Sequence, residues 1–332
     1  MQDSRIYSDF SKEAKWIRLR VASDVASLPL GLKALAQFYT QERLRILPGI
    51  SAPIAIDPNM GRPVPYAAFW FANALGLSDN YLMRLSGLCL VYNSLSTTLM
   101  DDIDDSAQGG KLVRAKLSEY WFRKYLAALE GIFPTKALFI QTTTWAEAEW
   151  QRYRVWNFES AGRNPLQPFS SASLIESSRY FVAVVLPTLA GIAYASHAED
   201  QVPRIERFLR YFSQGWRIFD DLMDWEKDLV SGYPYRSSVL RYIHDKNGGK
   251  TSLDRPTVLS WFLSREFIKD SYGAMIGFLT SAQRVARSFG NRYLATFMEQ
   301  QIEFHSKRRD SMLRAADLQL SMLQDALLEA TS

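Results

Sequence analysis

Three aspartates in the second half of the chain have a spacing that suits metal chemistry. Asp220, Asp224 and Asp228 follow one another at intervals of four in a stretch whose apolar residues recur at helical spacing. In an α-helix this interval places all three carboxylates on one face over two turns. Like charges at this spacing oppose helix formation by about 0.2–0.5 kcal/mol per pair, so the row needs a compensating cation. Ligands that are all oxygen suit Mg²⁺, which usually keeps several waters and shares its shell with a phosphate.

A second acidic group ends a long apolar helix predicted over residues 79–105. Asp101 and Asp105 share a helical face there, and Asp102 lies beside them. A helix C-terminus repels anions, so carboxylates at this end are unfavourable unless a divalent cation lies between them. An acidic helix end is often only a solvated cap, but two such ends on largely apolar helices favour metal binding. We therefore expect the two groups to face each other across a cavity.

Helices must position both acidic groups, because the sequence shows helical periodicity and no sustained strand alternation. This pattern predicts an all-α fold built as one bundle of long helices. Segments rich in proline and glycine divide the pattern. The expected helices cover residues 11–28, 30–47, 66–75, 79–105, 111–129, 135–158, 171–196 and 203–229, with two or three more between 257 and 329. The expected loops cover residues 48–65, 162–168 and 244–256.

Composition places the chain among ordinary soluble globular proteins, with 332 residues, 47% of them hydrophobic and 22% charged. No composition break or repeat appears, so we predict one domain over residues 1–332. The formal charge of +4 is too mild to indicate nucleic acid, and it suits an anionic small molecule at least as well. The single cysteine, Cys89, lies in an apolar run and excludes an internal disulfide, as expected of a reducing, cytoplasmic location.

Membrane insertion is not expected from the sequence. The first residues show no apolar signal segment. The longest apolar run, residues 180–196, is short for a membrane span and contains Pro187 and Gly191. It therefore predicts a buried helix.

The two acidic groups together resemble motifs of the class I isoprenoid synthases, a superfamily of trans-prenyl diphosphate synthases and class I terpene cyclases. Residues 101–105 (DDIDD) match the first DDxxD motif, and residues 220–224 (DDLMD) match the second DDxxD of the synthases. The longer string through Asp228 also fits the NDxxSxxxE motif of the cyclases, with Asp at its three ligand positions and Lys227 before the last acid. The resemblance covers residues 60–230 by motif and implies a helical bundle with a central active-site cavity.

Several positions depart from the synthases where a second diphosphate would bind. In the segment that resembles GKxxRP, the Lys is missing before Gly61-Arg62-Pro63. Residues 106–109 (SAQG) stand for the basic residues after the first motif. Ser177-Ser178-Arg179 stands for a Lys-Thr pair, and Trp216-Arg217 for a Phe-Gln pair. This loss of positive charge favours cyclisation of one substrate over condensation of two.

The resemblance implies a Mg²⁺-dependent class I terpene cyclase that ionises a linear C15 or C20 prenyl diphosphate and releases diphosphate. Three Mg²⁺ ions are expected by the same resemblance. A prenyltransferase or prenyl diphosphate synthase, condensing an allylic diphosphate with a second substrate, is the alternative. A non-catalytic synthase-like subunit that binds a partner is a third hypothesis, which intact acidic groups disfavour. The oligomeric state stays open, and a homodimer is implied by the family alone.

Site residues are assigned by position relative to the motifs. The metal ligands expected are Asp101, Asp102, Asp105, Asp220, Asp224 and Asp228. The residues expected to be catalytic are Asp101, Asp105, Arg179, Asp220 and Asp224. Arg179 stands where cyclases place an Arg that senses diphosphate, although an ion pair with Glu176 explains it equally well. Lys227, Arg308 and Arg309 are further candidates for the diphosphate, and a solvated helix face is the alternative for the last two.

An allylic cation would need a dry pocket lined by aromatic faces, each worth about 0.5–2 kcal/mol. The candidate rings are Phe69, Trp70, Tyr92, Trp145, Phe181 and Trp216. Plain core packing is the alternative for every one of them.

Overall fold

The computed structural model describes residues 5–43, 65–105, 110–163, 169, 171–230, 237–249 and 253–331. Over these ranges the regular structure is helical and contains no strand, which confirms the predicted all-α class. The chain divides into two compact units. The first comprises Met1–Glu149, Phe181–Leu209 and Val285–Phe297, and the second comprises Trp150–Tyr180, Arg210–Arg284 and Met298–Ser332. The expectation of one domain over residues 1–332 stays a prediction.

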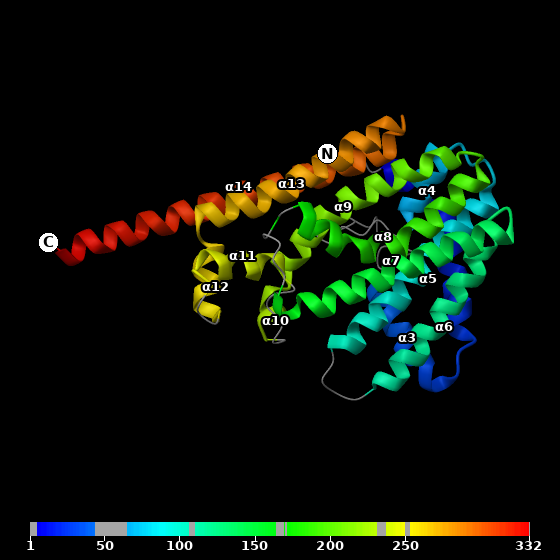
Figure 1. The fold of residues 1–332 in the computed structure, drawn as a ribbon, viewed down its shortest axis with the longest axis horizontal. Helices are drawn as coiled ribbons and strands as arrows, with labels where there is room; N and C mark the ends of the chain where they lie inside the picture. Colours follow the sequence, from blue (N-terminus) through cyan, green and yellow to red (C-terminus); the bar gives the residue numbers. More distant parts are fainter. Residues whose placement is uncertain are drawn as a thin grey trace. The chain divides into compact units, whose positions relative to one another are not determined.

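The first unit is built around the long helix α5 (Figure 1). It contains α1 (Arg5–Ser8), α2 (Ser11–Ala26), α3 (Leu30–Arg43), α4 (Tyr66–Ala74), α5 (Asn80–Asp105) and α6 (Lys111–Glu130), with parts of α7 (Lys136–Arg163), α8 (Ser171–Ala195), α9 (Val202–Met223), α13 (Arg265–Ser288) and α14 (Arg292–Thr331). Helix α5 packs along α6 and also contacts α2 and α4. A Cβ atom at Gly87 of α5 would lie 2.6 Å from Ile17 Cδ1 and 2.7 Å from Phe69 Cε1, so a glycine is needed at this close approach.

The second unit contains α10 (Trp225–Val230), α11 (Ser238–Lys246) and α12 (Arg255–Phe262), together with the remaining parts of the longer helices. Helices α13 and α14 run side by side (Figure 1), joined by an ion pair between Arg265 and Asp317. Helix α9 approaches α13 at Gly215, where a Cβ atom would lie 2.9 Å from Leu279 Cγ. Beyond Asp317 the C-terminal part of α14 runs on past α12 and α13 (Figure 1).

Over the described residues the predicted helices are found close to their expected positions. Helix α11 was not expected, and α7 extends into the loop expected over residues 162–168. The helix expected over residues 203–229 is two helices, because the backbone bends at Asp224 between α9 and α10. The expected loop over residues 244–256 is shorter than predicted, since it overlaps the end of α11 and the start of α12. Ser237 caps α11 by accepting a hydrogen bond from the backbone N of Leu240 at 3.4 Å, and Asp254 caps α12 in the same way.

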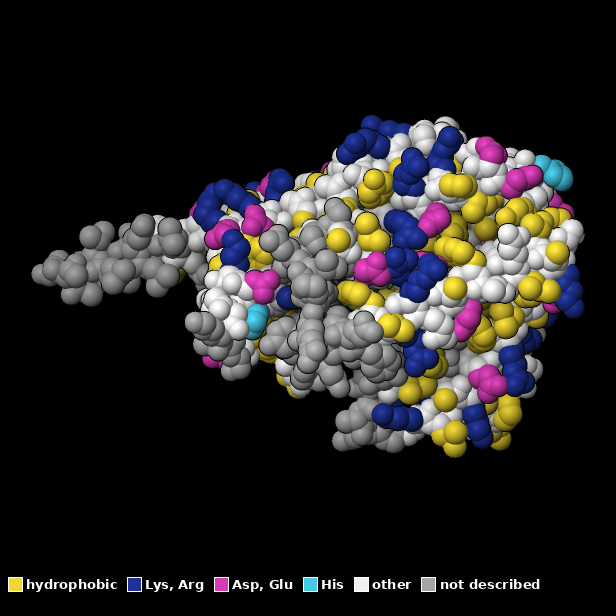
Figure 2. Space-filling view, in the orientation of Figure 1, with side chains coloured by type: hydrophobic (Ala, Val, Ile, Leu, Met, Phe, Trp, Pro, Cys, Tyr) yellow, Lys and Arg dark blue, Asp and Glu magenta, His cyan; other side chains and the backbone are white. Residues whose placement is uncertain are grey.

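The apolar run in α8 is largely buried. The stretch Ile175–Ala195 is long and apolar enough to cross a membrane by length and composition, and 61% of its most apolar window is buried inside the protein. A helix of the protein core has this burial, as predicted. Cys89 of α5 is also buried, and this burial raises the pKa of its thiol. On the surface shown in Figure 2, Lys and Arg side chains lie interspersed with hydrophobic and acidic ones.

Candidate active site

The second acidic cluster, Asp220, Asp224 and Asp228, lies where α9 ends and α10 begins. The backbone N of Asp224 donates to the carbonyl O of Asp220 at 2.9 Å, and the backbone N of Asp228 donates to Asp224 at 3.0 Å. These i to i−4 bonds keep the helical register across the bend, so the three residues stay on one side of the chain. Asp224 is exposed, while Asp220 and Asp228 are half-buried. The row therefore has the register predicted from its spacing and is open to solvent at its centre.

The electrostatics of this row favour a bound cation. The pKa of Asp228 is raised from 3.8 to about 6, first by burial and then by the negative charges of Asp221, Asp224 and Asp220, while Arg217 lowers it. A carboxylate that resists ionisation beside other carboxylates gains stability when a divalent cation binds among them. Aspartate oxygens are also the donors that Mg²⁺ prefers. The donor types of this row therefore suit Mg²⁺, and a metal ion bound by all three carboxylates stays a prediction.

Asp221 lies within the same acidic segment but serves a different purpose. Its side chain is buried, and one carboxylate oxygen accepts hydrogen bonds from the backbone N and the hydroxyl of Ser238, at 2.7 and 2.5 Å. The other oxygen lies 2.9 Å from Nε of Arg217. Burial raises the pKa of Asp221, whereas Arg217 and Ser238 lower it. The spacing of the acidic residues does not reveal this role.

A sequence signal for Asp221 nevertheless exists. The residue follows Ile218 by three positions and precedes Trp225 by four, and both of these apolar side chains are buried. Residues three and four apart share a helix face, so Asp221 belongs to the inward face of α9. A carboxylate on such a face requires a buried partner, which Arg217 and Ser238 provide.

The other candidates of the second unit lie in different surroundings. The guanidinium of Arg308 on α14 is 5.7 Å from the ring centroid of Phe219, and its Nη2 is 3.2 Å from the sulfur of Met223. Arg308 therefore lies at the end of α9, where it contacts the residues that directly precede Asp220 and Asp224. Arg309 pairs with its neighbour Asp310 at 2.9 Å.

Three further candidates for substrate binding belong to the second unit. Lys227 on α10 is exposed. Trp216 on α9 is half-buried and its ring contacts the rings of Phe212 and Phe219. Arg179 on α8 forms a two-pronged ion pair with Glu176, with Nε and Nη2 at 2.7 and 2.9 Å from its two carboxylate oxygens. The ion pair is the alternative expected for Arg179 from the sequence, and its role toward diphosphate stays a prediction.

The first acidic cluster lies in the first unit, at the end of α5. Asp101 is exposed, and Asp102 is half-buried and accepts a hydrogen bond from the hydroxyl of Tyr39 on α3. Burial, followed by this hydrogen bond and the charge of Asp102, raises the pKa of Tyr39 to about 12. Asp105 belongs to α5, but its side chain lies outside the described residues. The expectation that the two clusters face each other stays a prediction.

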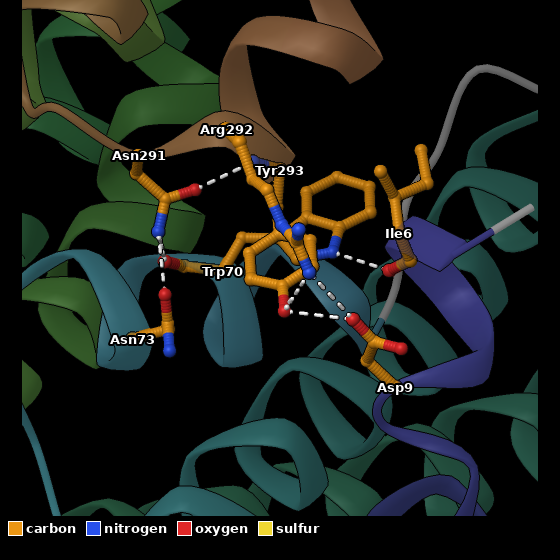
Figure 3. Close-up of polar contacts among 7 residues, drawn as sticks. All are labelled: Ile6, Asp9, Trp70, Asn73, Asn291, Arg292 and Tyr293. Carbon is orange, nitrogen blue, oxygen red and sulfur yellow. Dashed lines mark hydrogen bonds and ion pairs between the residues drawn. The ribbon is translucent and has the colours of Figure 1, made fainter. Parts of the chain in front are cut away.

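The aromatic candidates of the first unit are integrated into packing contacts. Phe69 and Trp70 are fully buried, and the indole Nε1 of Trp70 donates to the carbonyl O of Ile6 at 2.8 Å (Figure 3). The carbonyl of Trp70 in turn accepts from the side chain of Asn291, which precedes α14 and caps it (Figure 3). These contacts give Trp70 a structural use.

The remaining rings of this unit show a similar pattern. Tyr92 stacks on Trp121 with ring centroids 5.5 Å apart, and its hydroxyl donates to buried Asp24. Trp145 and Phe181 are half-buried. A role for any of these rings beside a substrate stays a prediction.

Parts of the predicted site lie outside the described residues. They include Gly61-Arg62-Pro63, the segment 106–109 and the segment 231–236 that follows α10. Among the side chains that the structure describes, no group of three or more His, Cys, Asp or Glu residues could hold a metal ion. Mg²⁺ commonly binds through one or two carboxylates and completes its shell with water and phosphate, so the cluster on α9 and α10 remains suited to it.

The comparisons with known proteins identify relatives of the fold. No protein-family model and no curated protein matches the chain. Among solved structures, a geranylgeranyl pyrophosphate synthase from Lactobacillus brevis ATCC 367 superposes with a TM-score of 0.64 and 12% identity, over 91% of this chain and 98% of its own. A geranylgeranyl pyrophosphate synthetase from the archaeon Geoglobus acetivorans gives a TM-score of 0.63 and 12% identity, over 91% and 98%.

A third solved structure shares the same fold. Octaprenyl pyrophosphate synthase from Helicobacter pylori gives a TM-score of 0.57 and 15% identity, over 88% of this chain and 98% of its own. The chain therefore has the all-α fold of these prenyl diphosphate synthases along nearly its whole length. At such low identity the likeness establishes the fold alone.

Proposed function

We propose that this chain is a Mg²⁺-dependent enzyme that ionises an allylic prenyl diphosphate and transfers the resulting allylic cation to a second substrate. The row Asp220, Asp224 and Asp228 carries the proposal, because its register and mutual repulsion suit a divalent cation. The fold likeness to prenyl diphosphate synthases supports prenyl transfer as the class of reaction. Mg²⁺, when bound, supplies positive charge to the leaving diphosphate.

The residues of the chain have three tasks in this reaction. Asp220, Asp224 and Asp228 hold the metal at the junction of α9 and α10, and we assign Asp101, Asp102 and Asp105 the same task at the end of α5. Arg308 lies near the row Asp220, Asp224 and Asp228 and adds positive charge that stabilises the departing group. Without cations the carboxylates and the diphosphate would repel each other. Two unit charges 4 Å apart repel by about 4 kcal/mol at an effective dielectric of 20.

Cyclisation of one substrate is the second candidate, and one observation favours it. Ser177-Ser178-Arg179 of α8 stands where the synthases' pattern has a Lys-Thr pair. Ser178 is buried and its hydroxyl donates to the carbonyl of Ile175 at 2.7 Å, and the charge of Arg179 is paired with Glu176. A buried serine supplies no positive charge for a second diphosphate. A terpene cyclase needs only one diphosphate and would be unaffected by this loss.

Incubation of the purified chain with C10, C15 and C20 allylic diphosphates in Mg²⁺ decides between the two reactions. Each substrate is tested with and without isopentenyl diphosphate, and products are identified by mass spectrometry. A longer prenyl diphosphate that forms only with the second substrate supports transfer. A terpene hydrocarbon or alcohol formed from one substrate alone supports cyclisation, and no consumption of any allylic diphosphate contradicts both.

A further inference from the structure

Asp221 and Ser238 form a clamp inside the second unit, and this clamp holds Arg217. The carboxylate of Asp221 is 2% exposed, so it lies inside the protein and not in the row of Asp220, Asp224 and Asp228. One of its oxygens accepts two hydrogen bonds from Ser238 at the start of α11, at 2.7 and 2.5 Å. Its other oxygen lies 2.9 Å from Nε of Arg217, one turn earlier on α9. These contacts fix the guanidinium at its Nε corner.

Arg217 is held at Nε, and its side chain is nevertheless partly exposed. Its side chain is 32% exposed, although its partner Asp221 is almost wholly buried. Asp221, followed by Tyr153, Asp220 and Asp228, raises its pKa, so it is a permanent cation. The guanidinium therefore lies in the electrostatic field of two carboxylates assigned to the metal.

The chemistry of arginine indicates what such a cation can bind. A guanidinium carries five N–H donors in a rigid plane, and Nε accounts for one of them. Pairs of the other donors match the oxygens of phosphate groups, and an arginine whose geometry is already fixed loses little conformational freedom on binding. A buried ion pair is weak evidence for stability, since apolar residues of equal volume often stabilise a fold as well. Its presence beside a metal-binding row favours a functional use.

The geometry points to Arg217 as a diphosphate-binding residue of the second cluster, positioned by Asp221 and Ser238. This assignment rests on the proposed function and adds a residue to it. With Mg²⁺ on the row, the carboxylates of Asp220 and Asp228 attract the guanidinium less strongly. The diphosphate, which carries more negative charge than a carboxylate, then competes for the remaining donors of the guanidinium, while Asp221 continues to hold Nε.

Calorimetric titration with inorganic diphosphate in saturating Mg²⁺ tests the assignment without turnover. The principal variant is R217Q/D221N, which removes both charges of the pair, leaves net charge unchanged and preserves neutral hydrogen-bonding groups. R217K keeps the positive charge but loses the planar fork. R255Q is the control, because Arg255 is 70% exposed and pairs on the surface with Glu226 at 2.8 Å.

We expect R217Q/D221N to weaken diphosphate binding about 10- to 100-fold, R217K to weaken it about 3- to 10-fold, and R255Q to leave it within about twofold. Titration of R217Q/D221N with Mg²⁺ alone should match wild type within about twofold. Diphosphate binding that is unchanged in R217Q/D221N overturns the assignment. If that variant does not fold, R217K decides, and binding at the wild-type level there overturns it equally. Failure of the wild-type chain to bind diphosphate with Mg²⁺ refutes the proposed function itself.

Discussion

The neighbouring residues Asp220 and Asp221 should respond in opposite ways to the same substitution. Asp221→Asn leaves the guanidinium of Arg217 beside a neutral amide in a buried contact. Breaking a buried ion pair usually costs about 3–5 kcal/mol, and the 32% exposure of Arg217 places the effect near the lower limit, at about 3 kcal/mol. The entropy of unfolding is about 2.1 cal/mol/K per residue, and the chain has 332 residues, so this loss lowers the melting temperature by about 4 °C.

Asp220→Asn should instead be neutral or slightly stabilising when no metal is present. Asp220 is half-buried and stands one turn before Asp224, so the substitution removes a repulsion of about 0.2–0.5 kcal/mol. Calorimetric unfolding of both variants in excess EDTA measures the contrast. The pair R217Q/D221N should recover most of the stability that Asp221→Asn loses, because no charge is then left without its partner. Equal melting temperatures for the two single variants would refute the different roles assigned to these residues.

Three further predictions concern stability. The pKa of His305 is lowered from 6.5 to about 4 by burial and by Arg308, so protonation favours the unfolded chain. The free energy of unfolding should therefore fall by about 1.4 kcal/mol per pH unit as the pH drops from about 6.5 toward 4. In urea titrations, His305→Gln should lack this slope. Gly215→Ala should destabilise the fold by about 1–3 kcal/mol because the new Cβ would meet Leu279. At Gly277 a Cβ meets nothing within 4 Å, so Gly277→Ala should stabilise the fold by about 0.4–1 kcal/mol. Similar melting temperatures for the two variants would contradict this. Asn291→Ala removes the cap of α14 and should lower the free energy of unfolding by about 2 kcal/mol in chemical denaturation, and an unchanged midpoint would show that the cap contributes nothing.

Helix content could be predicted from the sequence because proline and glycine divide clear helical periodicity. The bend at Asp224 could not, since no Gly or Pro marks it and the i to i−4 bonds continue across it. Helix α11 was also missed, although Ser237 is a typical N-cap and Val239, Leu240 and Ile243 form a short buried face. Nine residues are too few for periodicity alone to establish a helix.

The acidic row could be predicted because its interval of four residues is a property of sequence. The clamp around Asp221 could not, because it depends on Ser238, which lies seventeen positions further along the chain and meets Asp221 only in the folded unit. For Arg179 the structural contact could be predicted from the sequence, but a functional role could not. Its spacing from Glu176 already indicated the ion pair that the structure contains, while a role toward a ligand needs a measurement with that ligand.

The central claim is that the row on α9 and α10 binds Mg²⁺ in order to ionise a prenyl diphosphate. It is tested most directly by the rate at which the purified chain releases inorganic diphosphate from C10, C15 and C20 allylic diphosphates. Wild type should release diphosphate in Mg²⁺ and not in EDTA, and Asp224→Ala, a change at an exposed position, should fold normally and be slower by about 100-fold or more. Release that continues in EDTA, or an Asp224→Ala variant as fast as wild type, would contradict the claim.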